Sequence, residues 1–387
     1  MPALGSQTVR AVWTMALRKS FEDLKALRRP RGASLGGLRD WTRLREVLVG
    51  FLPGHPGAIA SLLRNPVVAT PLRCLRDGAA DPNEMISEVV GQALFALGRA
   101  GALPQTIQVE RAPKVLVGTS RDEWIAVPSG PVAFQNEGVF ASGRPLEPQR
   151  GAFLAFSRDA RLVLRDTNPL RSLEAHPDKQ GNEVDLGGRA PEDWTGMLDR
   201  ALNLIERHLP ASRAAIDLMI RHVVPVGYHE EQHLSASYRE ALGVVYTSLH
   251  PSVLTMAEAL LHETAHNVLH AMMELDPILQ NPPDELVESP WRPDPRPLSG
   301  VLLAVHAFLP VEALLRSMIA KGDPCVRSDT DEGAEPSLRP VDLERRLERV
   351  RKMNADGVQL LEKHMRPTAV GQGVVDEIGR LDSRFRS

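Results

Sequence analysis

The chain has 387 residues, which is enough for two or three domains of ordinary size. Hydrophobic residues make up 43% and charged residues 25% of it, a composition that excludes a mainly disordered protein. The 46 basic and 49 acidic residues leave a net charge of −3, which excludes the strongly basic surface of a typical nucleic-acid binder. We therefore expect a soluble protein with no nucleic-acid partner.

Two further features point to the cytoplasm. The only cysteines, Cys74 and Cys325, lie far apart and indicate a reducing compartment without a disulfide framework. The first residues lack the apolar segment of a secretion signal, and no run reaches the roughly 18 apolar residues of a membrane span. A cytoplasmic protein without a membrane partner is therefore expected.

In chain order, the sequence predicts three regions and an α+β fold that is mostly helical. Residues 1–105 show apolar positions at helical spacing, with a capped helix start at Asp81-Pro82. Residues 106–190 contain short β-branched runs separated by turn residues, followed by a polar loop, and indicate an antiparallel sheet or small barrel. Residues 191–387 are predicted to form a helical, metal-binding catalytic domain.

The third region carries most of the candidate chemistry. After a helix that opens at Pro191, it contains two short strands, a long helix, a proline-rich segment, an almost entirely apolar helix, an acidic loop and a charged final helix. The predicted bounds are 223–226 and 243–247 for the strands, 252–275 for the long helix, 277–297 for the proline-rich segment, 298–321 for the apolar helix, 323–340 for the loop and 341–364 for the final helix.

The long helix contains the string His262-Glu263-Thr264-Ala265-His266, an H-E-x-x-H motif. Residues four apart lie on one face of a helix, so both imidazoles can reach one metal ion. Glu263 is then placed to orient or deprotonate a bound water. The competing interpretation is a pair of core histidines, but the apolar run before the motif favours a metal site, with His262 and His266 as ligands and Glu263 as the catalytic residue.

The third metal ligand is less well defined by the sequence. His270 lies about 12 Å along the helix from His262, too far to share the ion. Met272 stands where a metzincin has its third histidine, which excludes that class. Glu285 and Glu288 lie in the proline-rich segment, without a helix to position them. His306, alone in an apolar helix, is either a third ligand or a core histidine bonded to a carbonyl, and we take it as the ligand.

A second string of the same form, His229-Glu230-Glu231-Gln232-His233, lacks the flanking apolar period of a helix. It is predicted to be a polar loop near the pocket rather than a metal site. Ser235 and Ser237, which follow it, are candidate substrate-binding residues.

The proline-rich segment includes Pro290-Trp291-Arg292-Pro293-Asp294-Pro295-Arg296-Pro297. Prolines stiffen this strap, so Arg292 and Arg296 are expected to project from a rigid backbone. Guanidinium groups bind carboxylates in a fork geometry, which indicates an anionic cosubstrate or a peptide carboxylate. Trp291 is a further candidate substrate-binding residue. The alternative is a proline linker with solvated arginines.

Three segments together resemble the HExxH-motif peptide-modification proteins, described as α-ketoglutarate-dependent HExxH-type peptide β-hydroxylases. The segments are Gly243-Val-Val-Tyr-Thr-Ser248, Ala259-Leu-Leu-His-Glu-Thr-Ala-His266 and Pro290-Trp-Arg-Pro-Asp-Pro-Arg-Pro-Leu-Ser-Gly300, and the resemblance covers about residues 223–320.

The resemblance implies a non-haem Fe(II) enzyme that uses α-ketoglutarate and O₂ to hydroxylate a β-carbon of a ribosomally made precursor peptide. It implies that His262 and His266 bind iron and that Arg296, with Arg292, binds the α-ketoglutarate carboxylate. Relatives place a histidine at the equivalent of Leu303 or Phe308, whereas this chain has His306, so the third ligand stays open.

Two alternatives remain. In a zinc metallopeptidase, Glu263 would be the general base for a zinc-bound water. In a metal-free module, the sheet predicted within 106–175 would bind a peptide at its edge. The expected partners are a precursor peptide and a small cosubstrate. A homodimer could form through the charged final helix.

Overall fold

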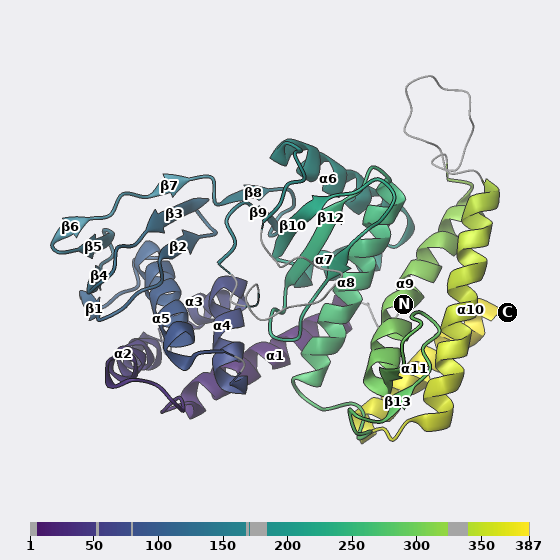
Figure 1. Ribbon diagram of the computed structural model, residues 1–387, viewed down its shortest axis with the longest axis horizontal. Coiled ribbons are helices and arrows are strands. Elements are labelled where there is room, and N and C mark those ends of the chain that lie inside the picture. Colours follow the sequence, from purple (N-terminus) through teal and green to yellow (C-terminus); the bar gives the residue numbers. More distant parts are fainter. Residues whose placement is uncertain are drawn as a thin grey trace.

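The computed structural model describes residues 6–51, 54–78, 80–167, 170, 184–323 and 340–386. It confirms the predicted α+β class, with helices in the majority and small antiparallel and mixed sheets. Figure 1 shows the N-terminal helices and small sheets at one end, a mixed sheet in the middle and three long helices at the other end. The predicted acidic loop at 323–340 lies almost entirely outside the described residues.

Five helices form the N-terminal part. The start of α5 is the one that the sequence predicts, because the Asp81 side chain accepts a hydrogen bond from the backbone N–H of Asn83. Helix α1 belongs to two hydrophobic cores, since Trp13 packs with the C-terminal elements and Leu24 with the N-terminal ones. The bounds are α1 Ser6–Ala26, α2 Leu35–Phe51, α3 Pro56–Arg64, α4 Pro66–Asp77 and α5 Pro82–Arg99.

The strands of the predicted β region are divided among three sheets, which corrects the expectation of a single antiparallel sheet or barrel. Two small antiparallel sheets have the orders β1-β4-β5-β6 and β2-β3-β7, and neither closes on itself. Their strands are β1 Ile107–Val109, β2 Val115–Gly118, β3 Glu123–Ala126, β4 Val132–Phe134, β5 Val139–Ala141, β6 Arg144–Pro145 and β7 Gln149–Arg150. The remaining two, β8 Phe153–Ala155 and β9 Arg161–Val163, belong to a third sheet.

That third sheet is mixed and joins the two ends of the molecule. Its order is β11-β12-β10-β9-β8, with β10 parallel to both β9 and β12. Neighbouring residues of a strand face opposite sides, so Val223 and Val245 enter the core beneath the C-terminal helices while Val224 and Val244 enter the N-terminal core. The later strands are β10 His222–Tyr228, β11 Ser235–Ala236 and β12 Val244–Leu249.

The helices α6 Pro191–His208, α7 Pro210–Met219 and α8 Val253–Met273 pack in the core on one side of this sheet. Ser252 caps the start of α8, because its side chain accepts a hydrogen bond from the backbone N–H of Thr255. Asn267 ties α8 to the start of β12, because its Oδ1 accepts a 2.6 Å hydrogen bond from the backbone N–H of Gly243.

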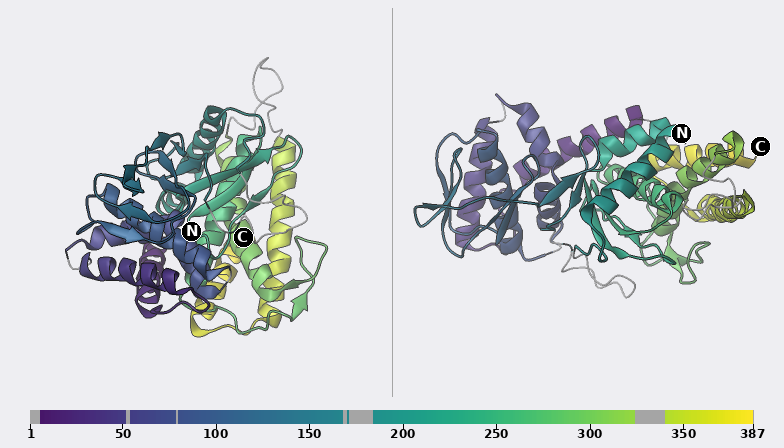
Figure 2. Two further views of the ribbon diagram at one scale, coloured as in Figure 1. Left: turned by 60° about the vertical axis from the view of Figure 1, so that its left-hand side comes forward. Right: turned by 90° about the horizontal axis from the view of Figure 1, so that it is seen from above.

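The proline-rich segment and the last three helices complete the fold (Figure 2). The segment contains a two-stranded ladder, β13 Leu286–Val287 with β14 Arg296–Pro297, which continues directly into α9 Leu298–Lys321. Helices α10 Pro340–His364 and α11 Ala369–Arg386 follow, and the sequence had not indicated α11. Within the described ranges, α9 alone is long and apolar enough to cross a membrane, and most of it is buried inside the protein.

Candidate metal centre

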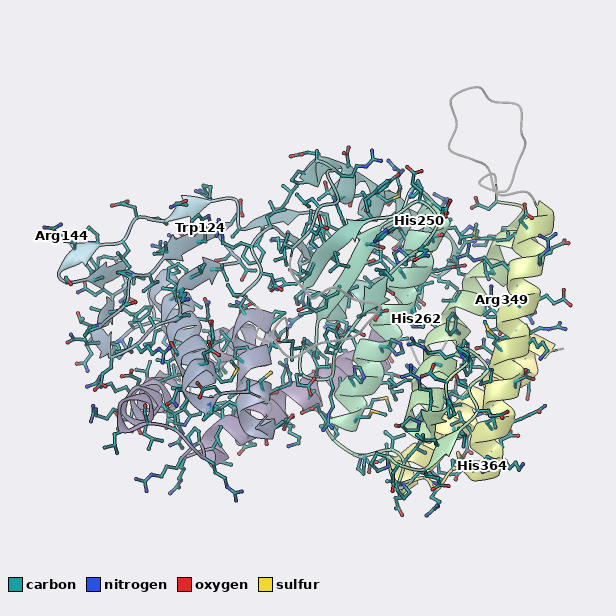
Figure 3. All side chains as sticks on the ribbon, in the orientation of Figure 1. Trp124, Arg144, His250, His262, Arg349 and His364 are labelled. Carbon is teal, nitrogen blue, oxygen red and sulfur yellow. The ribbon has the colours of Figure 1, made fainter. Side chains whose placement is uncertain are left out.

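Helix α8 carries a polar ladder, which we define as Glu258, His262, His266, His270 and Glu274. These residues follow one another at intervals of four, so they share one face of the helix. The middle of the ladder is accessible, because His262 and His266 are partly exposed whereas His270 and Glu274 are buried. Figure 3 shows His262 partway along α8. The accessible part of the ladder is thus the part that contains the two histidines of the motif.

The imidazoles of His262 and His266 lie side by side. Their ring centroids are 4.4 Å apart and their planes are nearly perpendicular, at 86°. Burial lowers the pKa of His262, so the ring is held in the neutral form that binds metal ions. The geometry thus places the two residues on one face of α8, as their spacing predicts, and their role as metal ligands stays a prediction.

Glu263 is fixed by the sheet. The Oγ of Ser235, on β11, donates a 2.6 Å hydrogen bond to Oε1 of Glu263. The Glu263 side chain is only 2% exposed, and its Oε2 has no hydrogen-bond partner among the described residues. Ser235, predicted to bind substrate, instead anchors Glu263.

His306 lies apart from the other two histidines. It sits on α9, is 3% exposed, and its ring hydrogen-bonds the backbone of Ala265. Burial lowers the pKa of His306 to about 4, so this histidine is neutral in the folded protein. The contact matches the alternative of a core histidine bonded to a backbone carbonyl, and the buried Nδ1 of the ring has no hydrogen-bond partner among the described residues. The structure does not bring His306 together with His262 and His266 as a ligand set.

The strap reaches the site through an aromatic contact. The ring of Phe308, on α9, lies 4.7 Å from that of His262 and stacks on Trp291 at 6.0 Å. Trp291 is wedged between α9 and α10, where a Cβ on Gly357 would fall on its ring. Trp291 therefore packs the strap against two helices. Its role in binding substrate stays a prediction.

The two strap arginines share one carboxylate. Arg296 Nη2 lies 2.8 Å from Asp294 Oδ2, and Arg292 Nε lies 3.6 Å from Asp294 Oδ1. The Nε of Arg296 is buried and makes no hydrogen bond to any described residue. The strap thus gathers two guanidinium groups around one carboxylate beside the aromatic contact.

Sequence reasoning gave too little weight to His233. Its Nε2 and Nδ1 lie 3.3 Å from Oγ1 of Thr247 and 3.4 Å from Oγ of Ser248. Burial, followed by nearby groups that include His250 and His262, lowers its pKa to about 4. The second His-x-x-x-His string is not a helix, yet its last histidine, His233, is buried beside His250 and within electrostatic range of His262. The repeated spacing in the sequence was the available signal.

Glu258 and Arg346 were also missed. Burial raises the pKa of Glu258 to about 7, and Arg346 of α10 opposes that rise by forming an ion pair with it. Glu258 could have been found, since it stands one turn before His262 on the same face. Arg346 could not, because its contact joins helices 88 positions apart. The Oγ of Ser237 is buried and has no hydrogen-bond partner in the described chain.

Comparison with known proteins does not assign this chain to a family. No protein-family model matches the chain, and no curated protein matches it.

The donor set fits a metal centre in part. Two imidazoles side by side suit a divalent first-row metal. A catalytic iron or zinc site takes three protein ligands and keeps a position open for substrate. Across the described ranges, no three His, Cys, Asp or Glu side chains are grouped so that they could hold a metal ion. The residues present therefore fit a two-histidine site and do not fit the three-histidine set that the sequence predicts.

Proposed function

We propose that this chain is a peptide-modifying enzyme that hydroxylates a residue of a ribosomally made precursor peptide, using Fe(II), α-ketoglutarate and O₂. The observation that carries the proposal is the pair of adjacent imidazoles, His262 and His266, on the partly exposed face of α8. The strap arginines next to the pair support it, because a keto acid needs a positive partner for its carboxylate. The resemblance of the three sequence segments supplies the reaction.

In this proposal, His262 and His266 would hold the iron, which would supply the oxidising chemistry when bound. Glu263, fixed by Ser235, would orient groups at the metal-facing side of the helix. Arg296, with Arg292, would bind the carboxylate of α-ketoglutarate. The aromatic pair Trp291 and Phe308 would keep the strap against the histidines and exclude water from that side.

The first test measures metal and turnover together. The protein is purified without oxygen and loaded with Fe(II), and its bound iron is measured. Succinate formation is then measured after O₂ is admitted together with α-ketoglutarate and a candidate precursor peptide. His262→Ala and His266→Ala are each expected to lose bound iron. His229→Ala, an exposed histidine of the second string, is the matched control and should retain it. Bound zinc with casein cleavage and no succinate would replace the proposal with a metallopeptidase.

His306→Ala separates the two sequence interpretations of that residue. Because its ring is bonded to the backbone of Ala265, the variant is expected to keep wild-type iron content. Arg296→Ala should also keep iron, while its apparent affinity for α-ketoglutarate falls about tenfold or more, the result of removing a charged hydrogen-bond donor. Loss of iron from His306→Ala would restore it as a ligand.

A second candidate function is peptide binding without a metal. The observation in its favour is that the residues described by the structure group no three metal ligands. In that case the wild type and His262→Ala would bind the precursor peptide equally well, and neither would retain iron. A peptide affinity that depends on iron would eliminate this candidate.

A further inference from the structure

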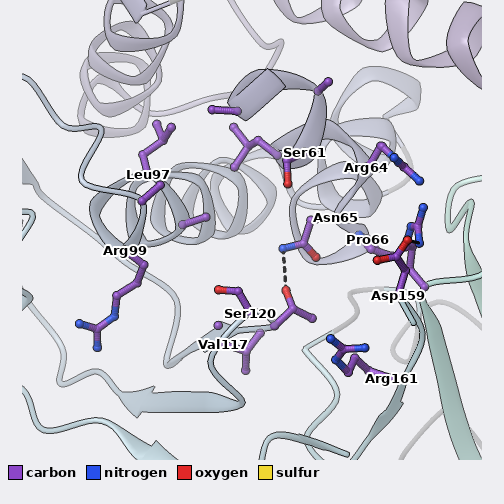
Figure 4. Close-up of a pocket in the computed structure, with 18 of the residues that line it drawn as sticks. Ser61, Arg64, Asn65, Pro66, Leu97, Arg99, Val117, Ser120, Asp159 and Arg161 are labelled. Carbon is purple, nitrogen blue, oxygen red and sulfur yellow. Dashed lines mark hydrogen bonds and ion pairs between the residues drawn. The ribbon is translucent and has the colours of Figure 1, made fainter. Parts of the chain in front are cut away.

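A cavity of about 530 Å³ lies far along the chain from the motif and has no role in the proposed reaction. Its walls come from α3, the end of α5, the turn after β2, the β8–β9 turn and the start of β10. No residue of α8 or of the strap lines it. The cavity therefore sits where the N-terminal helices meet the mixed sheet, and an inference from it is independent of the iron proposal. Figure 4 shows it in close-up.

One end of this cavity has an excess of positive charge. Arg64, Arg161 and Arg221 line it, together with the single carboxylate Asp159. Asp159 forms an ion pair with Arg221, at 3.2 Å between Oδ2 and Nη1. Neither Arg64 nor Arg161 forms an ion pair with any carboxylate in the described parts of the chain. Arg64 has only the longer-range attraction of the same Asp159, so three guanidinium groups at this end face one carboxylate. Figure 4 shows Arg64, Asp159 and Arg161 along one side of the cavity.

The hydrogen bonds of these two arginines leave donors to spare. Arg161 Nη1 donates to the backbone carbonyls of Ala160, at 2.9 Å, and Ser157, at 3.4 Å. Arg64 Nη2 makes one long contact, 3.4 Å, to the carbonyl of Leu218, and its buried Nε has no partner among the described residues. A guanidinium has five N–H donors, so each group can still bind an acid group in a fork geometry.

The N-terminus of α4 faces the same space. Asn65 caps this helix, with its Oδ1 accepting from the backbone N–H of Val67. Its Nδ2 donates to Oγ1 of Thr119 at 3.1 Å, which holds the turn after β2 across the cavity. The positive end of the helix dipole adds to the charge of the two arginines. A helix N-terminus is not by itself evidence of a binding site. Here it adds to the positive charge that the arginines already give this end of the cavity.

The opposite side of the cavity is neutral and partly apolar. Arg99 lies there, but its Nε is 2.8 Å from Oε1 of Glu123, so its charge is matched. Leu62, Leu97 and Val117 supply apolar wall between the two sides. A ligand that fits this cavity has an acid group at one end and an uncharged, largely apolar body behind it. The volume is in the range of ordinary small-molecule sites.

We propose that this cavity binds a small amphiphilic organic anion, with its acid group between Arg64 and Arg161 and its apolar body along Leu97 and Val117. The arginines select the charge, and the apolar wall selects an organic ligand over a bare inorganic ion.

The test uses octanoate as the probe and the full-length chain, with binding measured by titration calorimetry. 1-Octanol has the same body without the charge, and inorganic phosphate has charge without the body. Octanoate is expected to bind at least about tenfold more tightly than either, because each lacks one half of the recognition. Octanol binding as tightly as octanoate, or phosphate displacing octanoate at equal concentration, would overturn the proposed ligand class.

Variants locate the site. R64Q and R161Q are each expected to weaken octanoate binding about tenfold or more, since each removes a charged partner of the acid group. R158Q is the matched control, because Arg158 is an exposed residue of the same β8–β9 turn that does not line the cavity. Its affinity should equal that of the wild type. R161Q removes two bonds to backbone carbonyls, so R64Q gives the decisive result if R161Q does not fold.

Equal octanoate affinity in R64Q, R158Q and the wild type would overturn the proposal. Tighter binding of an acidic peptide such as triglutamate than of octanoate would also overturn it, because the surface would then recognise a polypeptide.

Discussion

The hydroxyl of Ser235 makes one hydrogen bond that positions Glu263, at 2.6 Å. We predict that Ser235→Ala lowers the free energy of unfolding by about 1.5–3 kcal/mol, the usual effect of losing a hydrogen bond to a charged group that stays buried. Urea denaturation followed by circular dichroism measures it. If Glu263 contributes to turnover, succinate formation should fall in the same variant, since the carboxylate loses its orientation.

Ser237 provides the matched control, because it is the same residue type two positions along the chain. Its Oγ is buried without a hydrogen-bond partner in the described residues, so Ser237→Ala should leave stability unchanged or slightly raised. Equal destabilisation by the two substitutions would show that the Ser235–Glu263 bond has no special role.

At the level of single residues, sequence spacing predicted contacts between side chains one helix turn apart, but not contacts between different helices. The pairing of His262 with His266 follows from four residues of separation on a helix. The place of His306 depends on the relative rotation of α8 and α9, which no local pattern encodes. The ring of His306 therefore bonds to the backbone of Ala265 and does not join the two imidazoles in a ligand set. The ion pair of Glu258 with Arg346 was beyond prediction for the same reason.

Between elements, the close approach of α10 to the strap depends on Gly357. A Cβ at this position would fall on Cη2 of Trp291 and lie 2.6 Å from Cγ2 of Val305. We predict that Gly357→Ala destabilises the protein by about 1–3 kcal/mol, the typical effect of overpacking, despite the higher helix propensity of alanine. Thermal or urea unfolding measures the change. The displaced strap should also weaken α-ketoglutarate binding.

Gly373 offers the opposite outcome from the same substitution. It lies in α11, is exposed, and has no atom near its ideal Cβ position. Gly373→Ala should therefore stabilise the protein by up to about 1 kcal/mol through helix propensity alone. If Trp291 is the obstacle, a smaller side chain at that position, as in Trp291→Leu, should relieve part of the cost of Gly357→Ala. Additive effects of the two substitutions would argue against direct contact.

The elements themselves were largely predictable where local signals are strong. The capped start of α5 at Asp81, the cap of α8 at Ser252 and the apolar run of α9 all have local physical causes, and each helix forms there. Strand membership was not predictable. β8 and β9 have the short β-branched runs of their neighbours, yet β9 pairs with β10, which begins about 60 residues later, and β8 joins the same sheet through β9. Pairing across such a separation leaves no trace in the periodicity.

Over the whole molecule, two structural features join the predicted regions. Helix α1 contributes to both large cores, and the mixed sheet is covered by a different core on each face. Neither the N-terminal helices nor the C-terminal helices can lose their structure without exposing apolar residues of the other part. The regions predicted at 1–105, 106–190 and 191–387 are therefore packed as neighbours with shared cores.

His222 lies where these parts meet, at the first position of β10 and 5% exposed. Its ring is 5.2 Å from that of Phe153 on β8, and it lines both the arginine-rich cavity and a small adjacent one. Burial, together with the charge of the nearby Arg161, lowers the pKa of His222 to about 3. Its unfolded value is about 6.5, so the unfolded chain binds more protons than the folded one between these two values.

The stabilisation that comes from keeping His222 neutral is therefore fully present above about pH 6.5 and is lost as the pH falls towards about 3. We predict that this histidine alone costs the wild type about 2 kcal/mol of unfolding free energy between about pH 7.5 and about pH 5. Urea denaturation at the two pH values measures it.

His222→Gln does not titrate, so its unfolding free energy should fall less over the same interval, by that amount. His229→Gln, which replaces an exposed histidine, should retain the wild-type pH dependence. If the unfolding free energy of the wild type and of His222→Gln depended equally on pH, the prediction would be wrong, because His222 would then be protonated in the folded protein without loss of stability.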